Sequence, residues 1–283
     1  MGFLNTSLVR RISTFSMCAF LLLGTTSACT KGTSGEQEEP PPAEQPTLRI
    51  MSYNIHWATG TDGILSLPRI AEVIKGSKAD VVVLNEVDRH YDPRSQYEDQ
   101  LQYLADELKM QYLFQKTTWK AAIPASGNKP REFGHAILSK YPLEQLNARI
   151  YDAYSTHYHG LLEAKVTVNE KPFLFYITHL DTDPASLSSQ ATQLRQWMAE
   201  RTGTKILCGD MNAVPENPAI THISEGMKDA FAGKQNAFTF KSNNPTIRID
   251  YILGSGDLSF SNSKVINSLA SDHFPIVTDI ILK

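Results

Sequence analysis

Hydrophobic and polar residues alternate along this chain in blocks, and the spacing within each block predicts its secondary structure. Segments such as 48–55, 80–86 and 205–210 are short apolar runs that end in polar residues, which is typical of buried strands. Several are apolar at consecutive positions, as in 81–84, so both of their faces need cover. The strands predicted in this way are 48–55, 80–86, 135–140, 161–168, 172–178, 205–210, 248–253, 258–266 and 274–282.

Other segments carry apolar residues at helical spacing. Ser66 is placed to cap a helix that has Pro68 in its first turn, and 96–109 and 187–198 repeat the helical pattern. A tight hairpin turn is expected at 169–171. Strands thus occur with and without helices between them. This order fits an α/β fold of four layers, an α/β/β/α sandwich in which two packed mixed sheets have outer helices. Spacing alone does not distinguish it from other α/β folds.

The N-terminal segment has the features of an export signal. Arg10 and Arg11 precede a short apolar run at 15–23, and small residues follow up to Cys29. The run is too short for a spanning helix. The segment end resembles a bacterial lipobox, although Thr26 stands where Leu is common. The resemblance favours a lipidated Cys29, and ordinary secretory cleavage at the same place is the alternative.

These features divide the chain into three parts. We expect a signal peptide over 1–28, and a lipidated Cys29 with a disordered tether over 29–46, which is rich in Gly, Ser, acidic residues and Pro. A catalytic domain is expected over 47–283. The protein would then be an exported lipoprotein of the bacterial cell envelope, at the outer membrane or the cell surface.

Charge argues against a tight non-specific binder of nucleic acid. The chain has 27 basic and 30 acidic side chains, and removal of 1–28 takes away two Arg and no acid, which leaves 25 against 30 and a net charge of −5. A local basic groove would still permit such binding. Cys208 is the one cysteine outside the signal and the lipidation site, so no intramolecular disulfide is expected. We predict that Cys208 is buried in the core.

Polar and ionisable residues recur where the predicted strands end or just beyond. Strand ends are rigid, so they deliver side chains to a cleft. Any one of these residues alone is more simply explained as a turn residue or a helix cap. Together they favour a catalytic site. The set comprises Asn54, Glu86, His179, Asp210, Asn212, Asp250, Asp272 and His273.

These residues lie in segments that resemble the endonuclease/exonuclease/phosphatase superfamily, which includes deoxyribonucleases, sphingomyelinases and inositol polyphosphate phosphatases. The most specific matches are the GDMN segment at 209–212 and the SDH segment at 271–273. The other matches are SYNIH, LNEVD, GHAILSK, THLD and RIDYIL, so the resemblance spans 52–276. It implies a deoxyribonuclease-like sandwich and metal-dependent hydrolysis of a phosphate ester.

The resemblance implies a metal site. Glu86 would be the central ligand, with Asn54 and Asp272 beside it. A hard cation with oxygen ligands suits phosphoryl chemistry, so Mg²⁺ is expected and Mn²⁺ would be able to replace it. The sequence contains no CxxC or HExxH spacing, which argues against zinc.

The resemblance also implies catalytic roles. Asp210 would orient or deprotonate the attacking water, and Asn212 would hold that water and a phosphate oxygen. Asp250 would fix the tautomer of His273 and raise its pKa, so that an imidazolium contacts the phosphate. His179 matches a residue that binds the phosphate from the other side. Either Asp210 or the Asp250–His273 pair is the base, and we favour Asp210.

The superfamily does not fix the substrate. We favour a phosphodiesterase or phosphatase for a small molecule or a lipid headgroup, acting as a monomer without a protein partner. A secreted nuclease and a non-catalytic surface-binding protein are the alternatives. The segment TIRIDYIL differs from the PAWCDRIL type of inositol polyphosphate phosphatases, and no inserted apolar loop of the sphingomyelinase kind is found.

A few further residues are candidates for the cleft. His56 either points into the cleft or only follows the first strand. Arg248 either faces the substrate or lies on the surface at a strand edge, and we favour the surface. His159 stands where related sequences often have Arg. The aromatic candidates, for which core or surface placement is the simpler expectation, are Trp57, Trp119 and Tyr154.

Overall fold

The computed structural model describes residues 46–152 and 159–282, which belong to one compact unit, Glu44–Lys283. The predicted signal peptide, the lipidated Cys29 and nearly all of the tether lie outside the described residues, as does Tyr154. No helix within the described part is long and apolar enough to cross a membrane.

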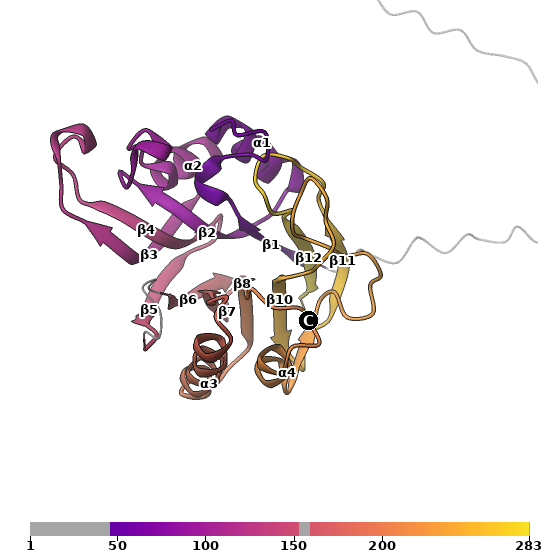
Figure 1. The fold of residues 1–283 in the computed structure, drawn as a ribbon. Helices are drawn as coiled ribbons and strands as arrows, with labels where there is room; N and C mark the ends of the chain where they lie inside the picture. The colour runs from indigo at the N-terminus through magenta and orange to yellow at the C-terminus, as the bar shows by residue number, and fades with distance from the viewer. Residues whose placement is uncertain (1–45, 153–158, 283) are drawn as a thin grey trace, which may run out of the picture. The chain divides into compact units, whose positions relative to one another are not determined.

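Two six-stranded sheets form the centre of the domain (Figure 1). The first sheet has the order β11-β12-β1-β2-β4-β3, and β1 and β2 are its parallel pair. Its strands are β1 (Thr47–Asn54), β2 (Val81–Arg89), β3 (Gln111–Lys120), β4 (Arg131–Ser139), β11 (Phe260–Val265) and β12 (Ile276–Ile281).

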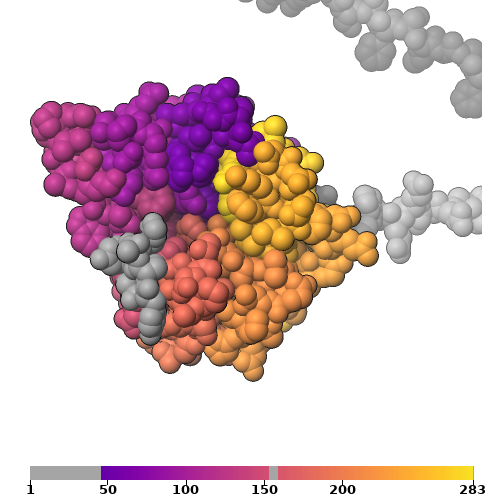
Figure 2. Space-filling view, viewed as in Figure 1, coloured from indigo at the N-terminus to yellow at the C-terminus, as the bar shows by residue number. Residues whose placement is uncertain are grey.

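The second sheet has the order β5-β6-β7-β8-β10-β9, and β7 and β8 are its parallel pair. In the space-filling view, the indigo, magenta and yellow segments of the first sheet lie above the salmon and orange segments of the second (Figure 2). The strands of the second sheet are β5 (Leu143–Ile150), β6 (Gly160–Val168), β7 (Lys171–His179), β8 (Lys205–Asp210), β9 (Met227–Asp229) and β10 (Asp250–Ser255).

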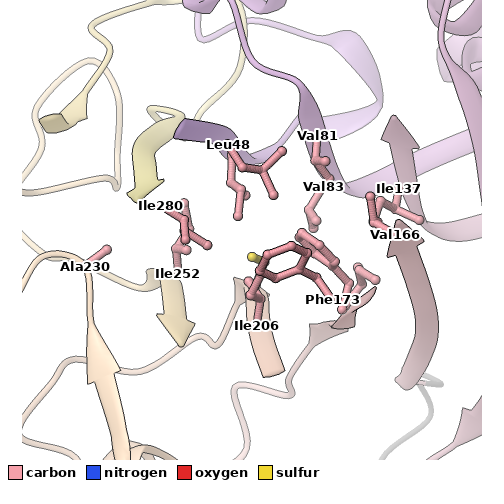
Figure 3. Close-up of a cluster of buried hydrophobic side chains, with 14 of the residues drawn as sticks. Leu48, Val81, Val83, Ile137, Val166, Phe173, Ile206, Ala230, Ile252 and Ile280 are labelled. Carbon is pink, nitrogen blue, oxygen red and sulfur yellow. The ribbon is translucent and has the colours of Figure 1, made fainter. Parts of the chain in front are cut away.

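Helices cover the outer faces of both sheets, which confirms the predicted four-layer sandwich (Figure 1). Three hydrophobic clusters fill the spaces between the layers. The central cluster joins the two sheets and includes Leu48, Val83 and Ile206 (Figure 3). Cys208 belongs to this cluster and is fully buried, as predicted. The helices are α1 (Leu67–Ser77) and α2 (Gln100–Leu108) on the first sheet, and α3 (Pro184–Ala199) and α4 (Pro218–Ser224) on the second.

The helix termini follow from local side-chain chemistry. Ser66 caps α1 by accepting a hydrogen bond from the backbone of Arg69, and Pro68 lies in the first turn, as predicted. The helix predicted over 96–109 is shorter, because Asp99 caps α2 and Gln96 has a left-handed backbone that no helix can contain.

The predicted hairpin at 169–171 is confirmed with a small shift. Asn169 and Glu170 have φ values of 48° and 65°, which suit a two-residue turn, and Lys171 already pairs with Val168. Strands β3, β5 and β9 were not predicted. β5, for example, lies at the sheet edge and has few buried positions, so it lacks the apolar contrast that marks a strand.

Candidate active site

The ends of the parallel strands of both sheets open into one cleft. In the first sheet Asn54 is paired in register with Asn85, and in the second sheet His179 is paired with Asp210. The cleft has a volume of about 700 Å³. The predicted site residues that line it are Glu86, His179, Asp210, Asn212, Asp272 and His273.

A bulge in β2 aims Glu86 at the cleft. The register of β2 against β4 shifts between Leu84 and Val87, and Glu86 has a φ of 58°. Such a conformation is strained for a residue with a side chain, and strain of this kind is typical of functional sites. The bulge and the strained backbone therefore support a functional role for Glu86 in the cleft.

Asn85, which sequence reasoning missed, joins the two sheets beneath the site. It is fully buried, donates to the carbonyl of Thr178 at 3.0 Å and accepts from the backbone N–H of Asp210 at 2.9 Å. Gly209 permits this approach, because a Cβ there would collide with the Thr178 carbonyl, and its φ is 143°. The glycine of the GDMN segment is thus explained by close packing of backbone on backbone.

Asn54 connects the carboxylates of the two halves. Its Nδ2 donates to Glu86 Oε1 at 2.9 Å and to Asp210 Oδ2 at 3.0 Å. Its Oδ1 accepts from the backbone N–H of His56 at 3.1 Å, which supports this orientation of the amide. In this arrangement Asn54 holds two carboxylates in place, and its role as a metal ligand stays a prediction.

Asp250 and His273 form a buried pair at the base of the cleft. Asp250 Oδ2 lies 2.9 Å from His273 Nδ1, and Asp210 Oδ2 lies 3.5 Å from His273 Nε2. Burial alone would lower the pKa of His273, but Asp250 and Asp210 offset it and raise that pKa to about 10. His273 is therefore an imidazolium at neutral pH, with Asp250 fixing the orientation of its ring.

His179 and Asn212 complete the opposite side. Asn212 donates from its backbone to Asp210 Oδ1 at 2.9 Å, and its Nδ2 lies 3.0 Å from His179 Nε2. His179 Nε2 is 3.5 Å from Asp210 Oδ2. Asp210 thus has Asn54, Asn212, His179 and His273 around it.

The chemistry of the site fits a divalent cation with oxygen ligands. Glu86, Asp210 and Asp272 bring three carboxylates into one cleft, where mutual repulsion favours a bound cation. Asp272 Oδ1 is buried and has no hydrogen-bond partner among the described residues. Asp210, Asp250 and His273 also offer ligand atoms within 4.8 Å of one another, but the direct contact between Asp250 and His273 accounts for that proximity.

Three histidines line the cleft beside this centre. His159 Nδ1 lies 2.8 Å from the carbonyl of His179, and the rings of His135 and His179 are 6.4 Å apart. Burial lowers the pKa of His135 to about 3, helped by the nearby His179 and His159, so its ring is neutral. At position 159, where related sequences often have Arg, this chain therefore has a histidine that contacts His179.

The remaining candidates divide clearly. His56 and Trp57 line the cleft, whereas Trp119 is 60% exposed and lies outside the cleft lining. The expectation for Arg248 was wrong: its side chain is only 9% exposed, because it forms an ion pair of 2.6 Å with Asp229. The cleft-lining residues that sequence reasoning missed are Tyr91, Arg94, Thr117, Thr118, Phe133, His135, Asp181, Thr182 and Phe240.

Solved structures of related folds resemble the chain at low identity. An endonuclease/exonuclease/phosphatase from Beutenbergia cavernae matches with a TM-score of 0.67 and 24% identity over 84% of this chain and 72% of the other. A mannosyl-6-phosphatase from Bacteroides thetaiotaomicron matches with a TM-score of 0.65 and 18% identity over 83% of this chain and 100% of the other. TDP2 from Caenorhabditis elegans matches with a TM-score of 0.61 and 20% identity over 83% and 74%.

Sequence comparison gives the same assignment. The Escherichia coli protein YbhP is 23% identical over 266 residues, which cover 86% of this chain and 100% of that protein. The model of the Endonuclease/Exonuclease/phosphatase family matches residues 51–273, a range that contains every predicted site residue. The chain belongs to the endonuclease/exonuclease/phosphatase family of phosphoester hydrolases.

Proposed function

We propose that this phosphoester hydrolase cleaves a phosphomonoester or phosphodiester of a small molecule or a lipid headgroup, with Mg²⁺ as its cofactor and Mn²⁺ able to replace it. The observation that carries the proposal is the gathering of Glu86, Asp210 and the Asp250–His273 pair around Asn54 in one cleft. The structural similarity to a mannosyl-6-phosphatase supports a small phosphate ester as substrate.

The residues that would hold the cation are Glu86 and Asp272, with Asn54 between Glu86 and Asp210. A bound cation would neutralise charge that develops on the phosphoryl oxygens. The buried Asp272 Oδ1 supports this assignment, because it has no hydrogen bond and only longer contacts with His56 Nδ1 at 3.8 Å and His273 Nε2 at 4.0 Å.

Asp210 is the proposed base. It lies at the centre of the donors around the site, and Asn212 orients one of its oxygens through a backbone hydrogen bond of 2.9 Å. His273 is held as a cation by Asp250 and so donates to a phosphoryl oxygen rather than accepting a proton. His179 would contact the phosphate from the other side of Asp210.

The charge of the cleft disfavours a nucleic acid substrate. Arg94 is the one arginine or lysine among the described residues that line it, and Arg94 is paired with the buried Asp88 at 2.9 Å. A polyanion needs several uncompensated cations along its path. The intact set of carboxylates and histidines likewise disfavours a non-catalytic binding protein. Action at the cell envelope, through a lipid at Cys29, is part of the proposal and accords with the basic and apolar N-terminal sequence.

The test is hydrolysis of p-nitrophenyl phosphate and bis-p-nitrophenyl phosphate by the purified protein with Mg²⁺, with Mn²⁺ and with chelator, beside a plasmid-nicking assay. Turnover that needs metal and favours the small esters supports the proposal. Nicking that exceeds turnover of both small esters would favour the nuclease, and metal-independent turnover would contradict the cofactor assignment.

A further inference from the structure

The cleft has a second region that the proposed chemistry does not use. Trp57, Tyr91, Arg94 and Phe133 line it beyond Glu86, and we call these four residues the aromatic–arginine wall. The guanidinium carbon of Arg94 lies 3.9 Å from the ring centre of Trp57 and 5.2 Å from the ring centres of both Tyr91 and Phe133. One cation is thus stacked among three aromatic rings at the edge of the cleft.

Buried groups hold this wall in place. Arg94 Nε and Nη2 donate at 3.0 and 2.9 Å to the two carboxylate oxygens of Asp88, which is fully buried. The buried side chain of Gln100 then ties the two parts together, because its Nε2 donates to the Trp57 carbonyl at 2.7 Å and its Oε1 accepts from the Asp88 backbone at 3.0 Å. The stack is therefore pre-organised from two separate elements.

The backbone at Trp57 is also strained. His56, Trp57 and Ala58 have φ values of 45°, 42° and 63°, so three consecutive side-chain-bearing residues lie in the left-handed region. Each such residue costs about 1 kcal/mol or more, and such strain persists where the surrounding structure enforces it. Strain, a buried carboxylate and a buried amide all serve to present Trp57 and Arg94 at the cleft, which points to a ligand.

The hydrogen-bonding capacity of the wall faces the cleft. Arg94 Nη1 has no acceptor among the described residues, although the side chain of Arg94 is only 31% exposed. Thr118 lines the cleft beside the wall and adds a hydroxyl group, whereas the hydroxyl of the buried Thr117 donates to the carbonyl of Phe133 at 3.3 Å. The wall thus combines aromatic surface with unused donors near the metal ligand Glu86.

We infer that the aromatic–arginine wall binds the sugar ring of a sugar phosphate, while the phosphate lies at the catalytic residues. This inference rests on the proposed function and names its substrate class. The apolar C–H face of a pyranose ring packs on aromatic side chains, and its hydroxyls accept from Arg94 and exchange hydrogen bonds with Thr118.

The charge and geometry of the wall favour a sugar over two other ligands. Asp88 pairs with Arg94, and Asp92 pairs with Lys120, whose Nζ lies 4.1 Å from the ring centre of Tyr91, so a second phosphate would meet no net positive charge. Neither neighbouring ring pair, Tyr91 with Phe133 (tilted by 37°) or His56 with Trp57 (tilted by 47°), forms a parallel sandwich for a nucleobase, and stacking on a single ring is tested with adenosine below. A neutral ring that carries hydroxyls matches both observations.

The test compares hexose 6-phosphates (glucose, mannose and galactose) with glycerol 3-phosphate, which carries the same ester without a ring. In the wild-type protein the best hexose ester should have the higher kcat/KM, by about tenfold. Trp57→Leu and, separately, Tyr91→Leu should remove this preference through KM, because they remove ring contacts and no catalytic group. Turnover of glycerol 3-phosphate should change less than about twofold, since that ester does not reach the wall.

Trp119→Leu is the matched control, because Trp119 is exposed and points to the opposite side of β3 from Thr118. It should keep the hexose preference. An equal loss on both esters in Trp57→Leu and Tyr91→Leu would show a structural role only and overturn the inference. So would a wild-type protein that turns over glycerol 3-phosphate as well as it does every hexose ester.

A second measurement separates this inference from the proposed function. Saturation-transfer NMR with methyl hexosides and with adenosine detects ring binding without any turnover. Transfer to a hexoside that is lost in Trp57→Leu supports the wall even if no phosphate ester is hydrolysed, which would contradict only the proposed function. No transfer to any hexoside, or transfer to adenosine alone, would overturn the sugar assignment.

Discussion

The two sheets bring their residues to the cleft in different ways. In the second sheet, regular pairing of β7 with β8 places His179 directly beside Asp210. In the first sheet, β1 and β2 form the equivalent parallel pair, but Glu86 reaches the cleft only through a bulge and a left-handed backbone. The irregular half also carries the strained turn at 56–58. Regular strand pairing thus places His179 beside Asp210, while distorted backbone brings Glu86 and Trp57 to the cleft.

The largest loss of activity is expected from a substitution at Glu86, the residue in the distorted part of β2. Glu86→Gln keeps the shape of the side chain and removes the charge that holds the cation, so kcat/KM should fall by about 10³-fold or more with the fold intact. Steady-state kinetics with Mg²⁺, beside circular dichroism, measure both. Glu170→Gln is the matched control, because Glu170 is exposed and has a similar φ of 65°. Near-wild-type activity in Glu86→Gln would show that the site assignment is wrong.

A second test concerns the Asp250–His273 pair, in which Asp250 begins β10 of the second sheet and His273 lies just before β12 of the first. Asp250→Asn removes one of the charges that raise the pKa of His273 and the carboxylate that orients its ring, so the imidazolium is less stable and kcat should fall by about 10²-fold. The measurement is kcat at neutral pH, with His273→Ala expected to be at least as severe. Asp257→Asn, in an exposed loop, supplies the control. An Asp250→Asn protein with unchanged kcat would remove His273 from the mechanism.

A substitution at Gln100, away from the reacting atoms, should affect the first-sheet side of the cleft and not the Asp210 side. Gln100→Leu leaves the part-buried Trp57 carbonyl and the buried Asp88 backbone N–H without partners, which should cost about 3 kcal/mol in the free energy of unfolding. It should also loosen the wall and reduce any hexose preference, while leaving the Asp210 side untouched. Denaturant unfolding and substrate preference measure the two effects. The control is Gln102→Leu, on the exposed face of the same helix.

The sequence predicted the regular half better than the irregular half, and the reason is physical. His179, Asp210 and Asn212 follow apolar runs directly, so a strand prediction also places them. Whether Asn85 or Glu86 faces the cleft depends on the bulge, and the family resemblance rather than the spacing identified Glu86.

The wall could not be predicted for a related reason. Tyr91 lies between elements and Arg94 lies in a 3-10 helix of only three residues (Pro93–Ser95), so neither leaves a periodic pattern, and Phe133 lies on a strand whose start was predicted too late. The burial of Arg248 was missed because it depends on an ion pair with Asp229. Asp229 belongs to β9, a strand of three residues that leaves no pattern in the sequence. Contacts between segments far apart in sequence are not encoded in local spacing.

The smallest effect is expected away from the cleft, where β1 pairs with β12. Arg49 donates to both carboxylate oxygens of the buried Asp279 at 2.6 and 2.8 Å, and this contact holds the pKa of Asp279 below its usual value. Asp279→Asn should lower the free energy of unfolding by about 1 kcal/mol near neutral pH and leave kcat unchanged.

The sign of the pH dependence follows from the lowered pKa. A carboxyl group whose folded pKa is depressed contributes stability above its unfolded pKa, about 4, and loses it as the pH falls through the folded value. The difference in unfolding free energy between wild type and Asp279→Asn should therefore be full at pH 7 and shrink below about pH 4. Denaturant unfolding at a series of pH values measures it. A difference that stays constant down to pH 3 would mean that Asp279 acts through packing rather than through its charge, and a loss of kcat would mean that this edge of the first sheet is coupled to the site after all.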